Sequence, residues 1–163
     1  MTLVSFEIAS LEAGRGTLGI CPIPGRDGGY AADLDLLLQW KPQMVLTMTE
    51  QVELERVGAR DFAQDLREAG IDWIHLPIRD FGAPKDQTLD QWSQASANVK
   101  TILNDGGRVL VHCFGGCGRS GMAIMRVMVE LGEEPDAALA RLRSVRPCAL
   151  ETAPQIDWAR NGQ

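Results

Sequence analysis

The sequence has no long apolar run, little positive charge and few residues that bind metal ions. No apolar stretch approaches the roughly 20 residues that span a bilayer. With 22 acidic against 16 basic residues, the net charge is −6. Nucleic acid and anionic membranes favour basic surfaces, so neither is an expected partner. The only histidines are His75 and His112, and no two cysteines have Cys-x-x-Cys spacing, so we expect no bound metal and no cofactor.

The four cysteines also lack the spacing of a secreted disulfide framework. The first residues, MTLVSFEIAS, contain no basic segment followed by a long apolar run, so we expect no signal peptide. Both features predict a protein of the reducing cytoplasm. A length of 163 residues with 45% hydrophobic content fits one packed domain over residues 1–163.

Strand-like and helix-like patterns alternate through the middle of the chain. This alternation predicts an α/β fold with a single, largely parallel central sheet flanked by helices. The apolar side of the fourth expected helix carries Leu89, Trp92, Val99, Ile102 and Leu103. The expected strands are 3–8, 17–23, 44–48, 71–78 and 108–112, and the expected helices are 31–40, 49–57 (with Thr49 as its N-cap), 61–69, 88–103, 119–131, 135–144 and 154–161.

The most informative segment is Val109–Gly121. A strand-like apolar run ends in His112 and Cys113, five residues with three glycines follow, and Arg119 and Ser120 open a helix-like pattern. Backbone N–H groups, a helix N-terminus and a guanidinium together form an anion cradle. The same groups favour a thiolate, so Cys113 is the expected nucleophile toward a bound phosphate. The expected phosphate-binding residues are Phe114, Gly115, Gly116, Cys117, Gly118 and Arg119.

The sequence His112-Cys113-x5-Arg119-Ser120 resembles the signature of the cysteine-dependent protein tyrosine phosphatase superfamily. Its form, His-Cys-aromatic-Gly-Gly-x-Gly-Arg-Ser, is similar to the dual-specificity branch and, within it, to kinase-associated phosphatase. The resemblance implies a dual-specificity-phosphatase-like fold. It also implies a phosphoprotein substrate carrying phosphotyrosine, with phosphoserine and phosphothreonine as further possibilities.

Two later segments extend the resemblance. Residues 76–84 are similar to that branch's general-acid loop, which implies that Asp80 is the acid. Residues 146–155 resemble a segment whose glutamine orients a water, which implies that role for Gln155. The expected reaction proceeds through a phosphocysteine intermediate.

Two residues of the loop have expected supporting roles. Ser120 is placed to donate a hydrogen bond to the Cys113 thiolate, most usefully when that thiolate is the leaving group. His112 precedes the nucleophile on a strand, so its side chain points to the opposite side. We therefore expect it to hold the shape of the loop rather than to act as a base.

Other interpretations of these residues stay open at this stage. Cys113 could be a buried structural cysteine, the nucleophile of a rhodanese-like sulfurtransferase, or part of a catalytically silent module that only binds phosphoproteins. Asp72 and Asp86 compete with Asp80 for the role of acid, although Asp72 lies at the start of a strand and Asp86 at the start of a helix. The oligomeric state is open, and a monomer is compatible with the sequence.

Cys117 and Arg26 each allow two interpretations, whereas the other two cysteines are expected to be structural. Cys117 either fills space or forms a reversible disulfide with Cys113 that protects the nucleophile from over-oxidation. Cys21 and Cys148 are expected to be inert packing. Arg26 either contacts substrate at the rim of the pocket or forms a surface salt bridge. We expect structural roles for His75, Trp73 and Trp92, and a solvated face for the acidic helix 49–57.

Overall fold

A five-stranded sheet forms the centre of the molecule. The computed structural model describes residues 6–161, and its strands lie in the order β1-β2-β5-β3-β4. β1 pairs with β2 in antiparallel fashion, and the other neighbours are parallel, which confirms the largely parallel sheet. The strands are β1 (Ala9–Ala13), β2 (Gly16–Cys21), β3 (Met44–Thr47), β4 (Asp72–His75) and β5 (Arg108–His112).

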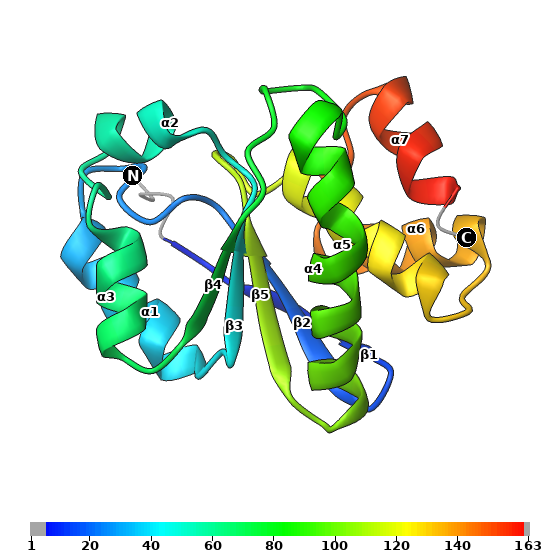
Figure 1. The fold of residues 1–163 in the computed structure, drawn as a ribbon, viewed down its shortest axis with the longest axis horizontal. Coiled ribbons are helices and arrows are strands. Elements are labelled where there is room, and N and C mark those ends of the chain that lie inside the picture. Colours follow the sequence, from blue (N-terminus) through cyan, green and yellow to red (C-terminus); the bar gives the residue numbers. More distant parts are fainter. Residues whose placement is uncertain (1–5, 162–163) are drawn as a thin grey trace.

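Helices cover both faces of the sheet (Figure 1). The helices α1, α2 and α3 lie on one side, and α4, α5, α6 and α7 lie on the other. Each side has its own apolar core, with Leu37, Phe62 and Leu66 on the first and Trp92, Val99 and Met125 on the second. The helices are α1 (Tyr30–Trp40), α2 (Gln51–Arg56), α3 (Phe62–Glu68), α4 (Asp86–Asn104), α5 (Gly118–Glu130), α6 (Pro135–Val145) and α7 (Ala153–Arg160).

β5 occupies the middle of the sheet because it pairs with β2 on one side and with β3 on the other. Residues 109–112 are buried, as expected for a parallel strand covered on both faces. The chain leaves β2 and β3 toward one face of the sheet, but it leaves β5 toward the other (Figure 1). Connections that diverge in this way leave a crevice at the carboxyl end of the strand, where ligands bind in such folds.

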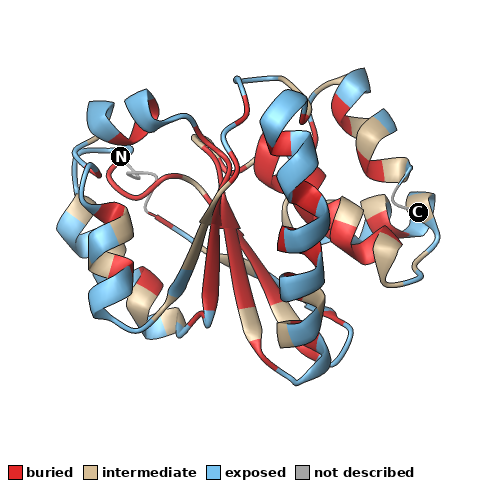
Figure 2. Ribbon diagram, in the orientation of Figure 1, coloured by how far each residue is buried: buried red, intermediate tan, exposed pale blue. Residues whose placement is uncertain are grey.

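Burial follows the layers, with buried strands and helices that expose their outer sides (Figure 2). On α4 the buried face runs through Thr88, Trp92, Val99 and Leu103 at helical spacing. The prediction that Leu89 belongs to this face is wrong, because its side chain is 47% exposed. Residue 89 follows residue 88 by about 100° around the helix, which turns it away from the core.

Several boundaries differ from the sequence expectations. Most of the expected strand 3–8 lies outside the described residues, and residues 6–8 are not in a strand. β1, at Ala9–Ala13, was not expected from the sequence. Helix α2 has Glu50 rather than Thr49 as its N-cap, because Glu50 and Glu53 form a capping box. Across residues 6–161 no helix is both long enough and apolar enough to cross a membrane.

Candidate active site

The loop that follows β5 turns its carbonyl groups outward. The carbonyl oxygen of Phe114 accepts a hydrogen bond from Ile23 N at 3.0 Å. The carbonyl oxygens of Gly115 and Gly116 accept from the guanidinium of Arg146 at 2.9 and 2.8 Å. In a trans peptide the N–H points away from the carbonyl, so the amides that follow these carbonyls face the inside of the loop. This orientation of the amides is compatible with the predicted anion cradle.

The inward amides have no protein partner. Within residues 6–161, no backbone N–H from Phe114 to Ser120 donates a hydrogen bond to another protein group. Arg119 Nε is likewise buried without a partner among the described residues. Buried polar groups are almost always paired in folded proteins, so the buried Arg119 Nε and the free amides beside it are suited to an acceptor from outside the chain. An oxyanion with several oxygens would satisfy all of them together.

Cys113 lies at the base of this loop. Its side chain is only 2% exposed, and its Sγ lies 3.1 Å from Ser120 Oγ. Ser120 is itself fully buried in the first turn of α5. The sulfur thus has one side-chain hydroxyl beside it, at the start of the loop that carries the free amides.

Arg119 is held by a carboxylate from another part of the chain. Its Nη1 and Nη2 each donate to Glu53 at 2.8 Å, and Nη1 also donates to the carbonyl oxygen of Ile78 at 2.9 Å. The side chains of Arg119 and Glu53 are 1% and 9% exposed. A two-pronged pair of this kind fixes the plane of the guanidinium and leaves Nε directed elsewhere. The expectation of a fully solvated helix 49–57 is wrong at Glu53, because this carboxylate faces the loop after β5.

The Arg119 guanidinium and the Glu53 carboxylate each favour the charged form of the other. Burial lowers the pKa of Arg119, but its hydrogen bonds to Glu53 and the nearby negative charges of Cys113 and Asp80 raise the pKa above the ordinary value. Burial raises the pKa of Glu53, but hydrogen bonds from Arg119 and from the Glu50 backbone lower it overall. Both groups are therefore ionised at neutral pH.

The structure brings Asp80 to Arg119, whereas neither of its competitors forms an ion pair with Arg119 among the described residues. Asp80 Oδ1 lies 3.3 Å from Arg119 Nη2 and accepts from Phe81 N at 3.0 Å. Its side chain is 56% exposed, so a substrate can reach it. Asp72 starts β4 at the opposite end of the strand, and Asp86 is the first residue of α4.

Gln155 is buried between the acid loop and the start of α5. Its Nε2 donates to the carbonyl oxygen of Gly82 at 3.1 Å, and its Oε1 accepts from Glu151 N at 2.8 Å. A methyl group on Gly118 would come within 3.0 Å of the Gln155 amide, so the two residues are in close contact. These contacts join the acid loop to the phosphate-binding loop. The water-orienting role of Gln155 stays a prediction.

His112 belongs to a chain of buried hydrogen bonds below the loop. Its Nδ1 lies 3.1 Å from the carbonyl oxygen of Cys113, which can only accept, so Nδ1 carries the proton. Its Nε2 therefore accepts from Thr47 Oγ1 at 2.8 Å, and Thr47 in turn accepts from Trp73 Nε1 at 2.7 Å. Burial lowers the pKa of His112 to about 4, and the charge of Arg119 adds to this effect. The neutral ring bonds to the backbone at the start of the loop, and its loop-shaping role stays a prediction.

This lowered pKa makes the stability of the protein depend on pH. Below about 6.5 the unfolded chain binds a proton at His112 that the folded protein refuses down to about pH 4. We therefore expect the free energy of unfolding to fall by about 2 kcal/mol between pH 7 and pH 5. Urea unfolding at the two pH values measures this difference. The variant His112→Gln should lack this part of the pH dependence, and an equal slope in both proteins would contradict the assignment.

Two expectations about cysteines are wrong. Cys117 is joined by a disulfide to Cys148, so Cys117 does not simply fill space and Cys148 is not inert packing. The pairing of Cys117 with Cys113 is absent from the structure, in which Cys113 and Cys21 are the free cysteines and both are buried. Arg26 lies at the rim, with its guanidinium carbon 5.8 Å from the centre of the Phe114 ring.

Comparison with known proteins identifies the family. The family model described as "Polymorphic toxin system, DSP-PTPase phosphatase" matches residues 23–133. The chain belongs to this family. It is 28% identical over 149 residues to the mouse protein named cyclin-dependent kinase inhibitor 3, covering 86% of this chain and 69% of that protein.

Solved phosphatase structures share the fold of this phosphatase. The kinase-associated phosphatase with a serine in place of its catalytic-site cysteine superposes with a TM-score of 0.83 at 24% identity, covering 97% of this chain and 94% of that chain. Tk-PTP in its active form superposes with a TM-score of 0.69 at 27% identity, covering 86% of this chain and 87% of that chain.

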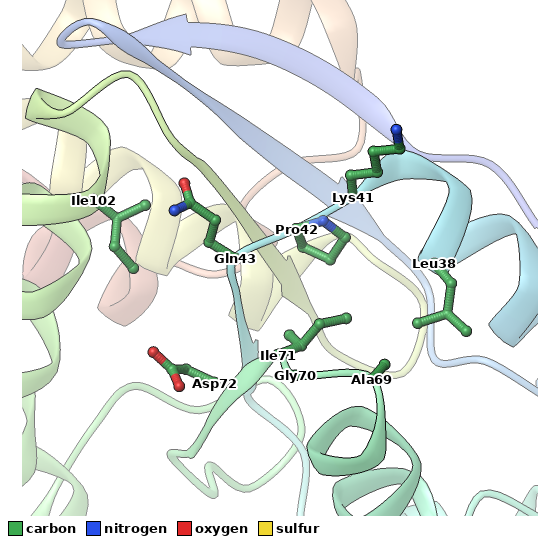
Figure 3. Close-up of a pocket in the computed structure, with 9 residues that line it drawn as sticks. All are labelled: Leu38, Lys41, Pro42, Gln43, Ala69, Gly70, Ile71, Asp72 and Ile102. Atoms are coloured by element: carbon green, nitrogen blue, oxygen red, sulfur yellow. The ribbon is translucent and has the colours of Figure 1, made fainter.

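Another pocket of this phosphatase lies away from the cysteine loop. It has a volume of about 520 Å³ and is lined by Gln43, which precedes β3, and Asp72, which begins β4 (Figure 3). Parallel strands begin at the edge opposite to the one where they end, so this pocket does not include the nucleophile. Among residues 6–161 there is no cluster of three or more His, Cys, Asp or Glu side chains that could hold a metal ion.

Sequence reasoning missed three residues of the site: Glu53, Arg146 and Cys148. Glu53 had a usable signal, because it follows a buried strand that ends at the same edge as β5. Arg146 had none, because an arginine in a loop between two helices is most often a solvated side chain.

Proposed function

We propose that this phosphatase hydrolyses phosphotyrosine in proteins through a phosphocysteine intermediate, with phosphoserine and phosphothreonine as further substrates. The observation that carries the proposal is the set of free amides and the free Arg119 Nε in the loop that begins at Cys113. These donors match the oxygens of a phosphate whose phosphorus faces the thiolate.

In the first step, Cys113 Sγ attacks phosphorus and the bond from phosphorus to the tyrosyl oxygen breaks. The electrons of that bond go to the leaving oxygen, which takes a proton from Asp80. The exposed carboxyl group beside Arg119 is suitably placed for this transfer. The loop amides and Arg119 stabilise the charge on the oxygens that do not react, which is the largest contribution expected in such a site.

In the second step, a water attacks phosphorus and the bond from sulfur to phosphorus breaks. Asp80, now a carboxylate, takes a proton from the water, and Gln155 orients that water. Cys113 leaves as a thiolate, which accepts a hydrogen bond from Ser120 Oγ at the observed distance of 3.1 Å. The site then releases inorganic phosphate and returns to its starting state.

A protein substrate is favoured over a phosphoinositide because the loop contains no lysine. The cytoplasm stays the location predicted from the sequence, although the Cys117–Cys148 disulfide is uncommon in a reducing compartment. Turnover of p-nitrophenyl phosphate and of matched phosphotyrosine and phosphoserine peptides tests the proposal. No turnover by protein with a reduced Cys113 would favour the alternative, a silent phosphoprotein-binding module.

Replacement of Asp80 should reveal its role through the leaving group. In Asp80→Asn the leaving oxygen receives no proton, which matters little for p-nitrophenolate and greatly for an alkoxide. We expect kcat to fall about 10-fold for p-nitrophenyl phosphate and about 10³-fold for an alkyl phosphate. Steady-state kinetics on a series of phosphate esters measures the difference.

Asp86→Asn is the matched control. It removes a carboxyl group from the same segment, at the first residue of α4, and should leave both rates unchanged. Equal losses for all leaving groups in Asp80→Asn would show that Asp80 is not the general acid.

A further inference from the structure

A disulfide connects the phosphate-binding loop to the segment between α6 and α7. Cys117, immediately before α5, is bonded to Cys148, 31 residues later, with their Cα atoms 5.1 Å apart. Cys117 is half-buried, and Cys148 is exposed. Covalent closure at this point bears directly on the geometry of the amides in the loop.

The segment 146–150 also holds the outer side of the loop through hydrogen bonds. Arg146 donates to the carbonyl oxygens of Gly115 and Gly116, and Leu150 N donates to that of Cys117 at 3.1 Å. A methyl group on Gly121 would come within 2.8 Å of Leu150 N, so α5 packs directly against this segment. Three successive carbonyls are thus turned outward by one segment, and the disulfide fastens that segment to the loop.

We propose that the Cys117–Cys148 disulfide is a positioning element that keeps the loop amides in their phosphate-binding orientation. The inference rests on the proposed function of the same loop. Without the bond, the hydrogen bonds from Arg146 and from Leu150 N must hold the loop alone, and water competes for those of the half-buried Arg146. Small errors in the placement of donors greatly weaken oxyanion binding and catalysis. Cys117 and Cys148 are therefore positioning residues, and neither one reacts with the substrate.

The exposure of Cys148 makes the bond accessible to reductants. A thiolate of a dithiol attacks one sulfur, and the other cysteine leaves as a thiolate and takes up a proton. The second thiol of the reductant then closes its own disulfide and releases the first cysteine, so two electrons and two protons pass to the protein. Cys113 is already a free cysteine and is unchanged by this exchange.

The test begins by counting thiols in the whole protein. Wild-type protein purified without reductant should show two alkylatable thiols after denaturation, assigned by peptide mass spectrometry to Cys21 and Cys113. After treatment with a phosphine or a dithiol, all four cysteines should react. Four free thiols in the untreated protein, unchanged by mild oxidation, would overturn the proposal because the bond would not form.

The loop itself is measured with tungstate, an oxyanion that does not oxidise thiols. We expect reduction of the wild type, or the substitution Cys148→Ala, to weaken tungstate binding and to lower kcat/KM by about 10-fold. The reductant should have no further effect on Cys148→Ala. The double variant Cys117→Ala/Cys148→Ala should lose no more tungstate affinity or kcat/KM than Cys148→Ala or Cys117→Ala alone. Each of these three variants removes the same bond.

Two controls separate positioning from stability. All measurements are made at least about 20 °C below the melting temperature of the weakest variant, where each protein is folded. Cys21→Ala removes a buried thiol but keeps the disulfide, so it should retain the response to the reductant. The proposal is overturned if Cys148→Ala has the same tungstate affinity and kcat/KM as the wild type, even if the melting temperature of the variant is lower.

The proposal can fail independently of the proposed function. Amide hydrogen exchange of residues 114–118, with and without tungstate, needs no turnover. If no form of the protein hydrolyses a phosphate ester, the proposed function fails, while tungstate binding and exchange still report on the disulfide. If turnover is normal but amide exchange and tungstate affinity are the same with and without the disulfide, only the positioning role fails.

Discussion

The variant Cys113→Ser is expected to hydrolyse p-nitrophenyl phosphate at least about 10⁴-fold more slowly than the wild type. A serine hydroxyl stays protonated at neutral pH, and the neighbouring His112 cannot serve as its base, because its ring bonds to Thr47 and to the loop backbone. The attack on phosphorus, which needs an anionic nucleophile, is then lost. Single-turnover kinetics with reduced wild type as reference measures the loss.

The same variant should still bind the oxyanion. The free donors belong to the backbone of Phe114–Ser120 and to Arg119 Nε, and none of them is removed by the substitution. We expect the dissociation constant of tungstate in Cys113→Ser to stay within a few-fold of the wild-type value. Residual turnover within about 100-fold of wild type would contradict Cys113 as the nucleophile.

The variant Glu53→Gln is expected to destabilise the protein by about 3 kcal/mol and to lower kcat/KM by about 100-fold. The substitution keeps the shape of the side chain but leaves the buried Arg119 charge without its counter-ion, and breaking a buried pair from one side typically costs 3–5 kcal/mol. The guanidinium also loses the two-pronged contact that fixes its plane. Misplacement of Arg119 by about 1 Å then accounts for the kinetic loss.

Urea unfolding and steady-state kinetics measure these two effects separately. Glu55→Gln is the matched control, because Glu55 lies exposed on the same helix, and its replacement should change stability by no more than about 0.5 kcal/mol. Adding Glu53→Gln to an Arg119→Gln background should cost far less than in the wild type, since the charge that needs compensation is gone. Additive losses in the double variant would mean that Glu53 acts independently of Arg119.

Local patterns predicted the centre of the fold well and its edge poorly. The strand 108–112 coincides with β5, because its centre, Val109–Val111, is a continuous apolar run buried on both faces of the sheet. The edge strand β1, with the sequence ASLEA and two exposed residues, has no such run and was missed. Leu89 was assigned to the core on hydrophobicity alone, whereas Thr88 and Ser96, which are polar, lie on the buried face of α4.

The sequence by itself determined the nucleophile loop, because all its elements are contiguous. A strand end, a thiol, turn-forming glycines, an arginine and the start of a helix must lie together when they occupy adjacent positions. Only the tertiary structure decided which distant side chains hold that loop. Glu53 is 66 residues from Arg119, and Cys148 is 31 from Cys117. Such contacts arise from the strand order β2-β5-β3 and from the packing of α5 against the segment before α7, and no local pattern encodes them.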